Sequence, residues 1–337
     1  MPALILMLAS GVAVPLGLAL TLTRRSNAAA DPLERRTLAR RSDDAADPLE
    51  RRTLARRSDD AADGPLGRGV LARVALRGAS GLRVVAPVGA VGGVLGWLAA
   101  PGSGLAIAGA AAYALVCVAA GVLGLARVLP DLRARAVPEL AIDVGLLFLP
   151  AAAVWLLAAR AGVPLAGFHE PVVTFTAAHF HFAGFAAPTI LGHVGHLVEE
   201  RPRALYRVAT VAVCAGVPLT AIGIATNHTV EQIAAVTVAL GMLAAAIVLV
   251  GFAARRAEAP LAKVLFVVSG TTLLLTMTLA ACFALTSSAG RGSSLQGIVP
   301  LQTMIDYHGG ANAIGFALSG LCALTLQRLR ARATAVP

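Results

Sequence analysis

Long apolar runs recur throughout this sequence, and each is close to the length that crosses a lipid bilayer. A spanning helix needs about 20 apolar residues, because a helix rises about 1.5 Å per residue through a hydrocarbon core about 30 Å thick. Of the 337 residues, 57% are apolar and only 14% are charged, whereas soluble domains carry about 25% charge. The pattern predicts an all-α fold, a polytopic bundle of transmembrane helices.

Nine runs are long enough to be spanning helices. They lie at 3–23, 82–100, 104–126, 139–160, 172–197, 204–225, 229–253, 262–286 and 300–326. We therefore expect four parts: a first transmembrane helix at 1–23, a cytoplasmic basic linker at 24–81, an eight-helix transmembrane domain at 82–327 and a cytoplasmic tail at 328–337.

Basic residues are distributed asymmetrically around these nine runs. If the N-terminus lies outside, the segments that face the cytoplasm hold 26 of the 28 Lys and Arg residues, and only Arg160 and Arg291 lie elsewhere. Cytoplasmic loops are enriched in Lys and Arg. The sequence thus predicts a multi-pass protein of the cell membrane with its N-terminus outside and its C-terminus in the cytoplasm. The same asymmetry explains the net charge of +10 without a nucleic-acid partner.

The linker contains a tandem repeat of 16 residues. "ADPLERRTLARRSDDA" occupies 30–45 and recurs unchanged at 46–61. Each copy is polar, mixed in charge and contains a proline, which is typical of a disordered or partly helical linker. Within residues 66–83, Arg68, Arg73 and Arg77 are spaced among apolar residues, and this pattern predicts a short helix on the cytoplasmic membrane surface.

Two histidines interrupt the apolar stretch "TAAHFHFAGFAAP" at 176–188. Ionisable residues inside a membrane are costly and often functional. In the predicted topology, His179 and His181 lie roughly 10–14 Å below the outer end of the fifth helix, and His308 lies at a similar depth in the ninth. Residues two apart on an α-helix are separated by about 200°, so His179 and His181 should face different neighbours.

Other polar residues gather at the same predicted depth or just above it. His308 and Asn312 are four residues apart and share a helix face, while His228 and Glu231 open the seventh helix at the outer surface. We therefore expect a substrate or proton site in the outer half of the bundle, drawn from His179, His181, His308, Asn312, Asp306, His228 and Glu231.

A second polar group lies toward the predicted cytoplasmic side. Glu139 and Asp143 share a face at the start of the fourth helix, and His193 and His196 share a face near the end of the fifth. Residues near the interface are easily hydrated. This group is therefore either a second functional site or a set of ordinary interfacial residues.

The histidine segments carry a family resemblance. "HFHFAGFAAP" (179–188) and "HGGANAIGFALSGL" (308–321) resemble the YndJ-like family of bacterial multi-pass membrane proteins, and the hydrophobic layout over 82–326 is similar too. The resemblance implies a transporter-like membrane protein of undefined activity. "AHFHF" is also similar to the His-Phe-His-Tyr run of subunit I of haem–copper oxidases, in which histidines on opposite helix faces ligate two haems.

Three functions remain open at this point. The resemblance favours a transporter, with the lipid bilayer and an unknown small molecule or ion as partners. The same histidines (His179, His181 and His308) could instead ligate haem or a metal in a redox protein, since neutral imidazoles are good ligands. They could also be interhelical hydrogen-bonding groups without catalytic function. No phosphate loop, GxGxxG or H-E-x-x-H motif is present in the sequence, so we do not expect a soluble enzyme's chemistry.

Overall fold

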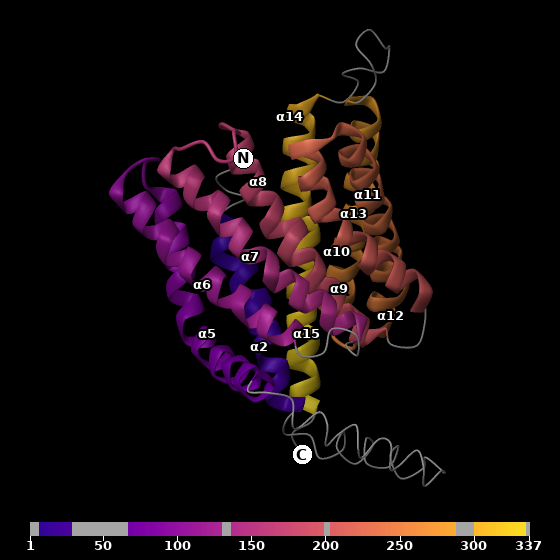
Figure 1. The fold of residues 1–337 in the computed structure, drawn as a ribbon. Coiled ribbons are helices and arrows are strands. Elements are labelled where there is room, and N and C mark those ends of the chain that lie inside the picture. The colour runs from indigo at the N-terminus through magenta and orange to yellow at the C-terminus, as the bar shows by residue number, and fades with distance from the viewer. Residues whose placement is uncertain (1–6, 29–66, 130–135, 199–202, 288–299, 335–337) are drawn as a thin grey trace.

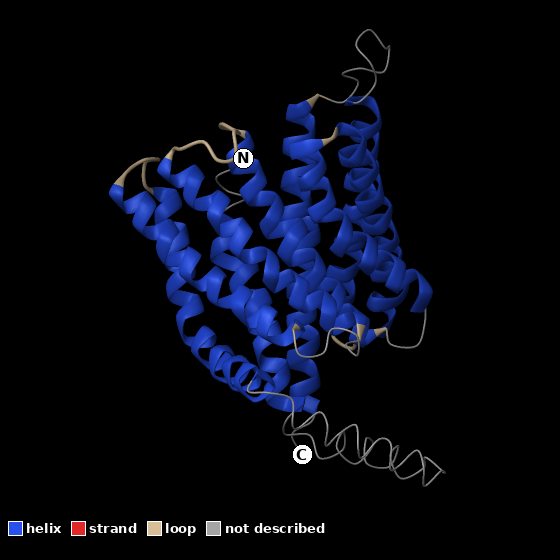
Figure 2. Cartoon of the chain, viewed as in Figure 1, coloured by secondary structure: helices blue, strands red, loops and turns tan. Residues whose placement is uncertain are grey.

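A computed structural model describes residues 7–28, 67–129, 136–198, 203–287 and 300–334. Within these ranges the chain forms helices joined by turns, and no strand is present (Figures 1 and 2). The predicted all-α fold class is therefore confirmed. The tandem repeat at 30–61 lies outside the described residues.

The helices follow one another as an extended series. The first are η1 (Ala9–Ala13), α2 (Val14–Ala28), α5 (Gly67–Leu98), α6 (Gly104–Val128) and α7 (Val137–Ala161). One unbroken helix comes next, made of α8 (Val172–His179), η2 (Phe180–Ala186) and α9 (Ala187–Leu197). The chain continues with α10 (Arg203–Thr226), α11 (His228–Val248), η3 (Leu249–Ala253), α12 (Ala254–Arg256) and α13 (Pro260–Ser287). The last are α14 (Leu301–Thr303), η4 (Met304–Gly309), η5 (Asn312–Leu318) and α15 (Ser319–Thr334).

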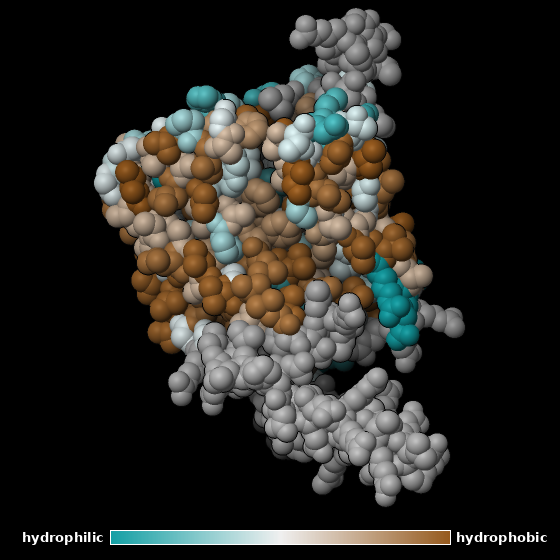
Figure 3. Space-filling model, in the orientation of Figure 1, coloured by the Kyte–Doolittle hydropathy of each residue, from teal (hydrophilic) through white to brown (hydrophobic). Residues whose placement is uncertain are grey.

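The surface of the bundle is apolar, as a lipid-facing surface must be. Seven of the described helices are long and apolar enough to cross a membrane. Large apolar side chains stand outward from them, with Val84, Leu115 and Leu275 at 74%, 73% and 70% exposure. Figure 3 shows apolar residues over the middle of one face and more polar residues near its upper end. The protein is a multi-pass membrane protein.

Two of the nine expected spans differ from the other seven. The helix over 172–197 is continuous, but it carries four histidines, and these lower its mean hydropathy. The apolar part of the first helix, Ala9–Leu22, is shorter than a full span. The count of nine spans and the orientation of the termini therefore stay predictions.

The expected surface helix at 66–83 is not a separate element. α5 runs unbroken from Gly67 to Leu98 and so joins this segment to the second expected span. The segment lacks proline and is rich in Ala, Leu and Arg, which are good helix formers. The helix therefore continues past the position where the sequence analysis placed a boundary.

Two groups of helices flank a central group (Figure 1). α5, α6 and α7 pack together on one side, and α10, α11 and α13 pack together on the other. Between them lie α2, the helix over 172–197 and the helix over 304–334. The first and last described helices touch, and the Arg328 guanidinium donates a hydrogen bond to the Leu20 carbonyl. The histidine-bearing helix is thus at the centre of the bundle.

Arg160 is one of the two basic residues that the charge pattern leaves on the outer side. It is only 4% exposed, and it folds back onto the C-terminal end of α5. Its Nε donates to the Gly96 carbonyl at 3.0 Å and its Nη2 donates to the Ala99 carbonyl at 2.6 Å. Its guanidinium carbon also lies 4.4 Å from the centre of the Trp97 ring. The residue therefore caps a helix C-terminus, where a cation is favoured.

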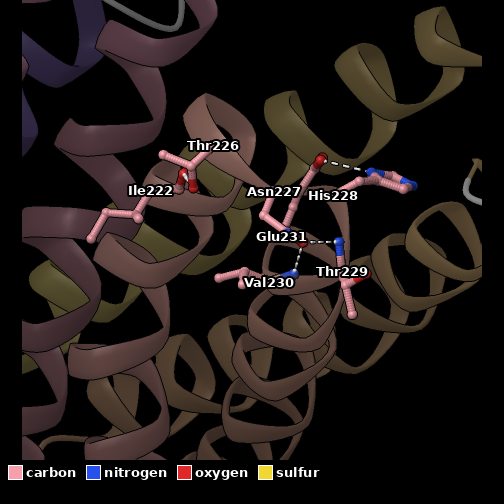
Figure 4. A network of polar contacts seen from close by, with 7 residues as sticks. All are labelled: Ile222, Thr226, Asn227, His228, Thr229, Val230 and Glu231. Atoms are coloured by element: carbon pink, nitrogen blue, oxygen red, sulfur yellow. Dashed lines mark hydrogen bonds and ion pairs between the residues drawn. The ribbon is translucent and has the colours of Figure 1, made fainter.

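The turn between α10 and α11 is fixed by its own sequence (Figure 4). The Asn227 side chain accepts hydrogen bonds from the Thr229 and Val230 amides at 2.9 and 3.3 Å, which is a typical helix N-cap. The two helices touch here, because a Cβ on Gly223 would lie 2.2 Å from the Glu231 amide nitrogen. The turn holds the start of α11 in one place.

Candidate functional site

Two adjoining cavities lie between the central helices and the group of α10, α11 and α13. The inner cavity, of about 250 Å³, has mostly apolar walls with His179, His308 and Asn312 among them. The mouth cavity, of about 290 Å³, adds the polar residues Thr220, His228, Glu231 and Gln232. His228 is largely exposed, so the mouth cavity lies at the end of the bundle near the α10–α11 turn.

Five residues line both cavities and so form the boundary between them. We call this boundary the neck, and its residues are His179, Val238, Met277, Met304 and His308. They come from α8, α11, α13 and η4. The neck is therefore a meeting point of four separate helical segments.

His308 is held in one tautomer by the neighbouring helix. Its Nδ1 lies 3.2 Å from the Thr276 carbonyl oxygen, which can only accept, so Nδ1 carries the proton and Nε2 keeps its lone pair. The Asn312 amide nitrogen lies 3.4 Å from the same Nδ1, which is too long for a good hydrogen bond. Asn312 instead accepts from the Thr276 hydroxyl at 2.7 Å. α13 thus positions both polar residues of the last helix.

His179 faces both cavities without a hydrogen bond to any described residue. It stands at the end of α8, and η2 begins at the next residue. Such π-helical turns are rare and often occur at functional sites. The imidazole is available to a ligand in the neck.

His181 lies on the other side of the same helix. It is 1% exposed, its Nδ1 donates to the Ala177 carbonyl at 2.7 Å, and its ring stacks on Tyr113 of α6 with centroids 5.6 Å apart. It lines neither cavity. The two histidines face different neighbours, as helix geometry predicts, so His179, His181 and His308 do not form one ligand set.

The other expected residues of the outer site divide in the same way. Asp306 accepts a hydrogen bond from the Gln302 amide at 2.8 Å and is absent from the described lining of both cavities. His228 and Glu231 form a pair, with Nδ1 and Oε2 3.0 Å apart (Figure 4), and both line the mouth cavity. The structure therefore brings together five of the seven expected residues and leaves out His181 and Asp306.

Of the group expected on the cytoplasmic side, the structure pairs Glu139 with His196 and Asp143 with Arg127. His196 Nε2 lies 3.1 Å from a Glu139 oxygen, His193 is 7% exposed, and Asp143 pairs with Arg127 at 3.6 Å. His196 lies about 25 Å along the helix from His179. Arg127 directly follows the expected span at 104–126, and the acidic Asp143 within the next apolar run was the sequence signal for its partner.

Met277 and Met304, the two methionines of the neck, were not expected from the sequence. Methionine is an ordinary filler of apolar cores, and nothing in the sequence separates Met277 and Met304 from such fillers. Among the described residues, no group of three or more His, Cys, Asp or Glu could hold a metal ion. The donors at the neck are instead two imidazoles and two thioethers.

Comparison with known proteins agrees with the membrane architecture. The family model for YndJ-like proteins matches residues 68–316. The uncharacterized membrane protein YndJ of Bacillus subtilis (strain 168) is 26% identical over 191 residues, which cover 57% of this chain and 33% of that protein. The matched region thus spans about a third of the relative's length, and no solved structure matches the chain. Because the family match extends from α5 to the last helix, the chain belongs to the YndJ-like family of membrane proteins.

Proposed function

We propose that this protein carries a small cation across the membrane by way of the mouth and inner cavities. The observation that carries the proposal is the row of polar groups along the two cavities. It starts at the exposed pair His228 and Glu231, passes His179 and His308 at the neck, and ends at Asn312. Polar groups that line a water-filled path through a bundle are typical of ion and substrate routes.

The charges around this path favour a cation over an anion. Glu231 is the acidic residue of the described lining, and neither lining includes a Lys or Arg. Anion sites usually need cationic side chains or helix N-termini aimed at the ligand. The asymmetry of basic residues in the sequence supports a mouth that opens to the outside.

The far end of the helix over 172–197 supports a carrier rather than an open pore. There His196 of α9 pairs with Glu139 of α7, a contact between the central helix and a flanking group. A carrier would open at this end by rearranging such contacts. Alternate opening of two ends is what a carrier requires.

Charge movement in proteoliposomes tests this function. Full-length protein on a solid-supported membrane would be exposed to concentration jumps of H⁺, Na⁺, K⁺ and Ag⁺. We expect a transient current for at least one of them, strongly reduced in His308→Asn. His169→Asn is the matched control, because His169 is exposed and lines neither cavity. Currents equal to those of protein-free vesicles for all four ions, or unchanged in His308→Asn, would contradict the proposal.

Haem ligation by His179 and His308 is the second candidate. It is favoured by one observation: both imidazoles line the same cavity. Against it, a cavity of about 250 Å³ lies below the usual range for drug-sized ligands, and a haem needs more space. A Soret band in the purified protein that disappears in His308→Asn would favour this candidate over cation transport.

A further inference from the structure

We propose that the neck is a binding site for a soft monovalent metal ion of the Cu(I) type. The ligands are the imidazoles of His179 and His308 and the thioethers of Met277 and Met304. The proposal rests on the transport function above for the ion's onward movement and names the class of its cargo. Binding at the neck can be measured separately from transport.

The first support is the convergence of donors. Four of the five residues that line both cavities carry a nitrogen or sulfur donor, and Val238 is the fifth. The whole chain contains five methionines, and three of them, Met242, Met277 and Met304, line the inner cavity. The apolar core here is built mainly of Ala, Leu and Val, and the methionines in it, Met242 and Met277, both border the inner cavity.

The second support is the way the two helices place their donors side by side. His308 bonds through Nδ1 to the carbonyl of Thr276, and Met277 is the next residue. Met304 precedes His308 by one turn within η4. A single hydrogen bond between α13 and η4 therefore places two thioethers and one imidazole around the same boundary.

The third support is the tautomer. A metal-bound histidine usually donates its other ring N–H to a carbonyl or carboxylate, which fixes the ring and leaves the remaining nitrogen for the metal. His308 has this arrangement, because Nδ1–H donates to a carbonyl and Nε2 is left as an acceptor. His179 has no hydrogen bond to a described residue and also borders both cavities. Both imidazoles are available in the neutral form that metals require.

The donor set selects the ion. Thioethers are soft ligands that favour Cu(I), while carboxylates and carbonyls suit Mg²⁺ and Ca²⁺. All four donors are neutral, so a bound monovalent ion adds one buried charge, and the cost of burying an ion rises steeply with its charge. Glu231 at the mouth attracts cations, but it is paired with His228 and does not border the inner cavity.

Metal binding by purified full-length protein is the direct test. Ag⁺ serves as a redox-stable probe, and Cu(I) is measured in competition with a chromophoric Cu(I) chelator under ascorbate. We expect one ion per chain, with affinity reduced at least tenfold in Met277→Leu and in Met304→Leu. A Met-to-Leu exchange keeps side-chain volume, so the fold should tolerate it. Met7→Leu, a methionine on the first helix outside both cavities, is the matched control and should bind like the unmodified protein.

Two outcomes would overturn this site. One is the absence of Ag⁺ and Cu(I) binding, and the other is full affinity in both Met277→Leu and Met304→Leu. If no metal binds while H⁺, Na⁺ or K⁺ still produces a His308-dependent current, the metal site fails and cation transport stands. If one ion binds at the neck but no ion produces a current, the metal site stands and the transport function fails.

Discussion

Replacing Arg160 with methionine should measure how strongly the C-terminal end of α5 is held. The substitution keeps a long side chain but removes the donors that reach the Gly96 and Ala99 carbonyls at 3.0 and 2.6 Å. It also removes the guanidinium above Trp97. The Gly96 carbonyl belongs to the last turn of α5, and Ala99 directly follows the helix. Water can therefore replace part of the hydrogen bonding that the substitution removes.

The expected cost follows from these contacts. A hydrogen bond from a charged donor contributes about 1.5–3 kcal/mol, and a cation–π contact contributes about 0.5–2 kcal/mol. Because Ala99 is only half-buried, water can replace its hydrogen bond, so we count one hydrogen bond and the cation–π contact. Together these give about 2–5 kcal/mol, and we take the lower part of that range. Arg160→Met should lower the free energy of unfolding by about 2–4 kcal/mol. Arg160→Lys keeps the charge but cannot reach both carbonyls with a planar fork, so it should cost about half as much.

Titration with SDS in mixed micelles gives this free energy. The chain has only two tryptophans, and Trp97 lies directly under the guanidinium, so its fluorescence reports both the contact and its loss. A change below about 0.5 kcal/mol, within the range of ordinary surface substitutions, would refute the capping role of Arg160. Equal destabilisation by Lys and Met would refute the part assigned to charge.

Three further substitutions test other contacts. Gly223→Val should lower the melting temperature in detergent and the cation current together, because its Cβ would lie 2.2 Å from a backbone nitrogen of α11; unchanged melting would contradict the close approach. Thr276→Val keeps the shape but removes the hydroxyl that donates to Asn312 at 2.7 Å, and an SDS titration should show a loss of about 0.6–1.7 kcal/mol. Asp143→Asn should cost about 3–5 kcal/mol by leaving the Arg127 charge buried, and adding Arg127→Met should recover much of it, whereas additive losses in the double variant would show that the pair is not coupled.

The helical architecture could be predicted from the sequence because it depends on local composition. Apolar runs of spanning length set the helix positions, and the residues of α6 and α7 agree with their predicted ranges to within a few residues. α5 is the exception, because a separate surface helix was expected at 66–83, whereas one helix runs from Gly67 to Leu98. Its basic residues interrupt the apolar pattern but are good helix formers.

The candidate site could be predicted only in part. The helix period placed His179 and His181 on opposite faces, and the spacing of His308 and Asn312 placed them together. Which face looks into a cavity depends on how three groups of helices pack, and no local pattern contains that information. The neck is the clearest case. Met277 and Met304 come together only because α13 and η4 pack side by side and both border the two cavities.

The central place of the helix over 172–197 has a consequence for how the protein is made. This helix carries four histidines and touches both the first helix and the helix over 304–334. When this helix enters the membrane, the first helix and α7 have already been synthesised and can pack against it. The segment that carries His308 is synthesised only after α10, α11 and α13. Until then the neck lacks the segment that carries Met304 and His308. The cavity is therefore completed only late in assembly, and a chain truncated before the last helix would leave the imidazole of His179 in a cavity that lacks one wall.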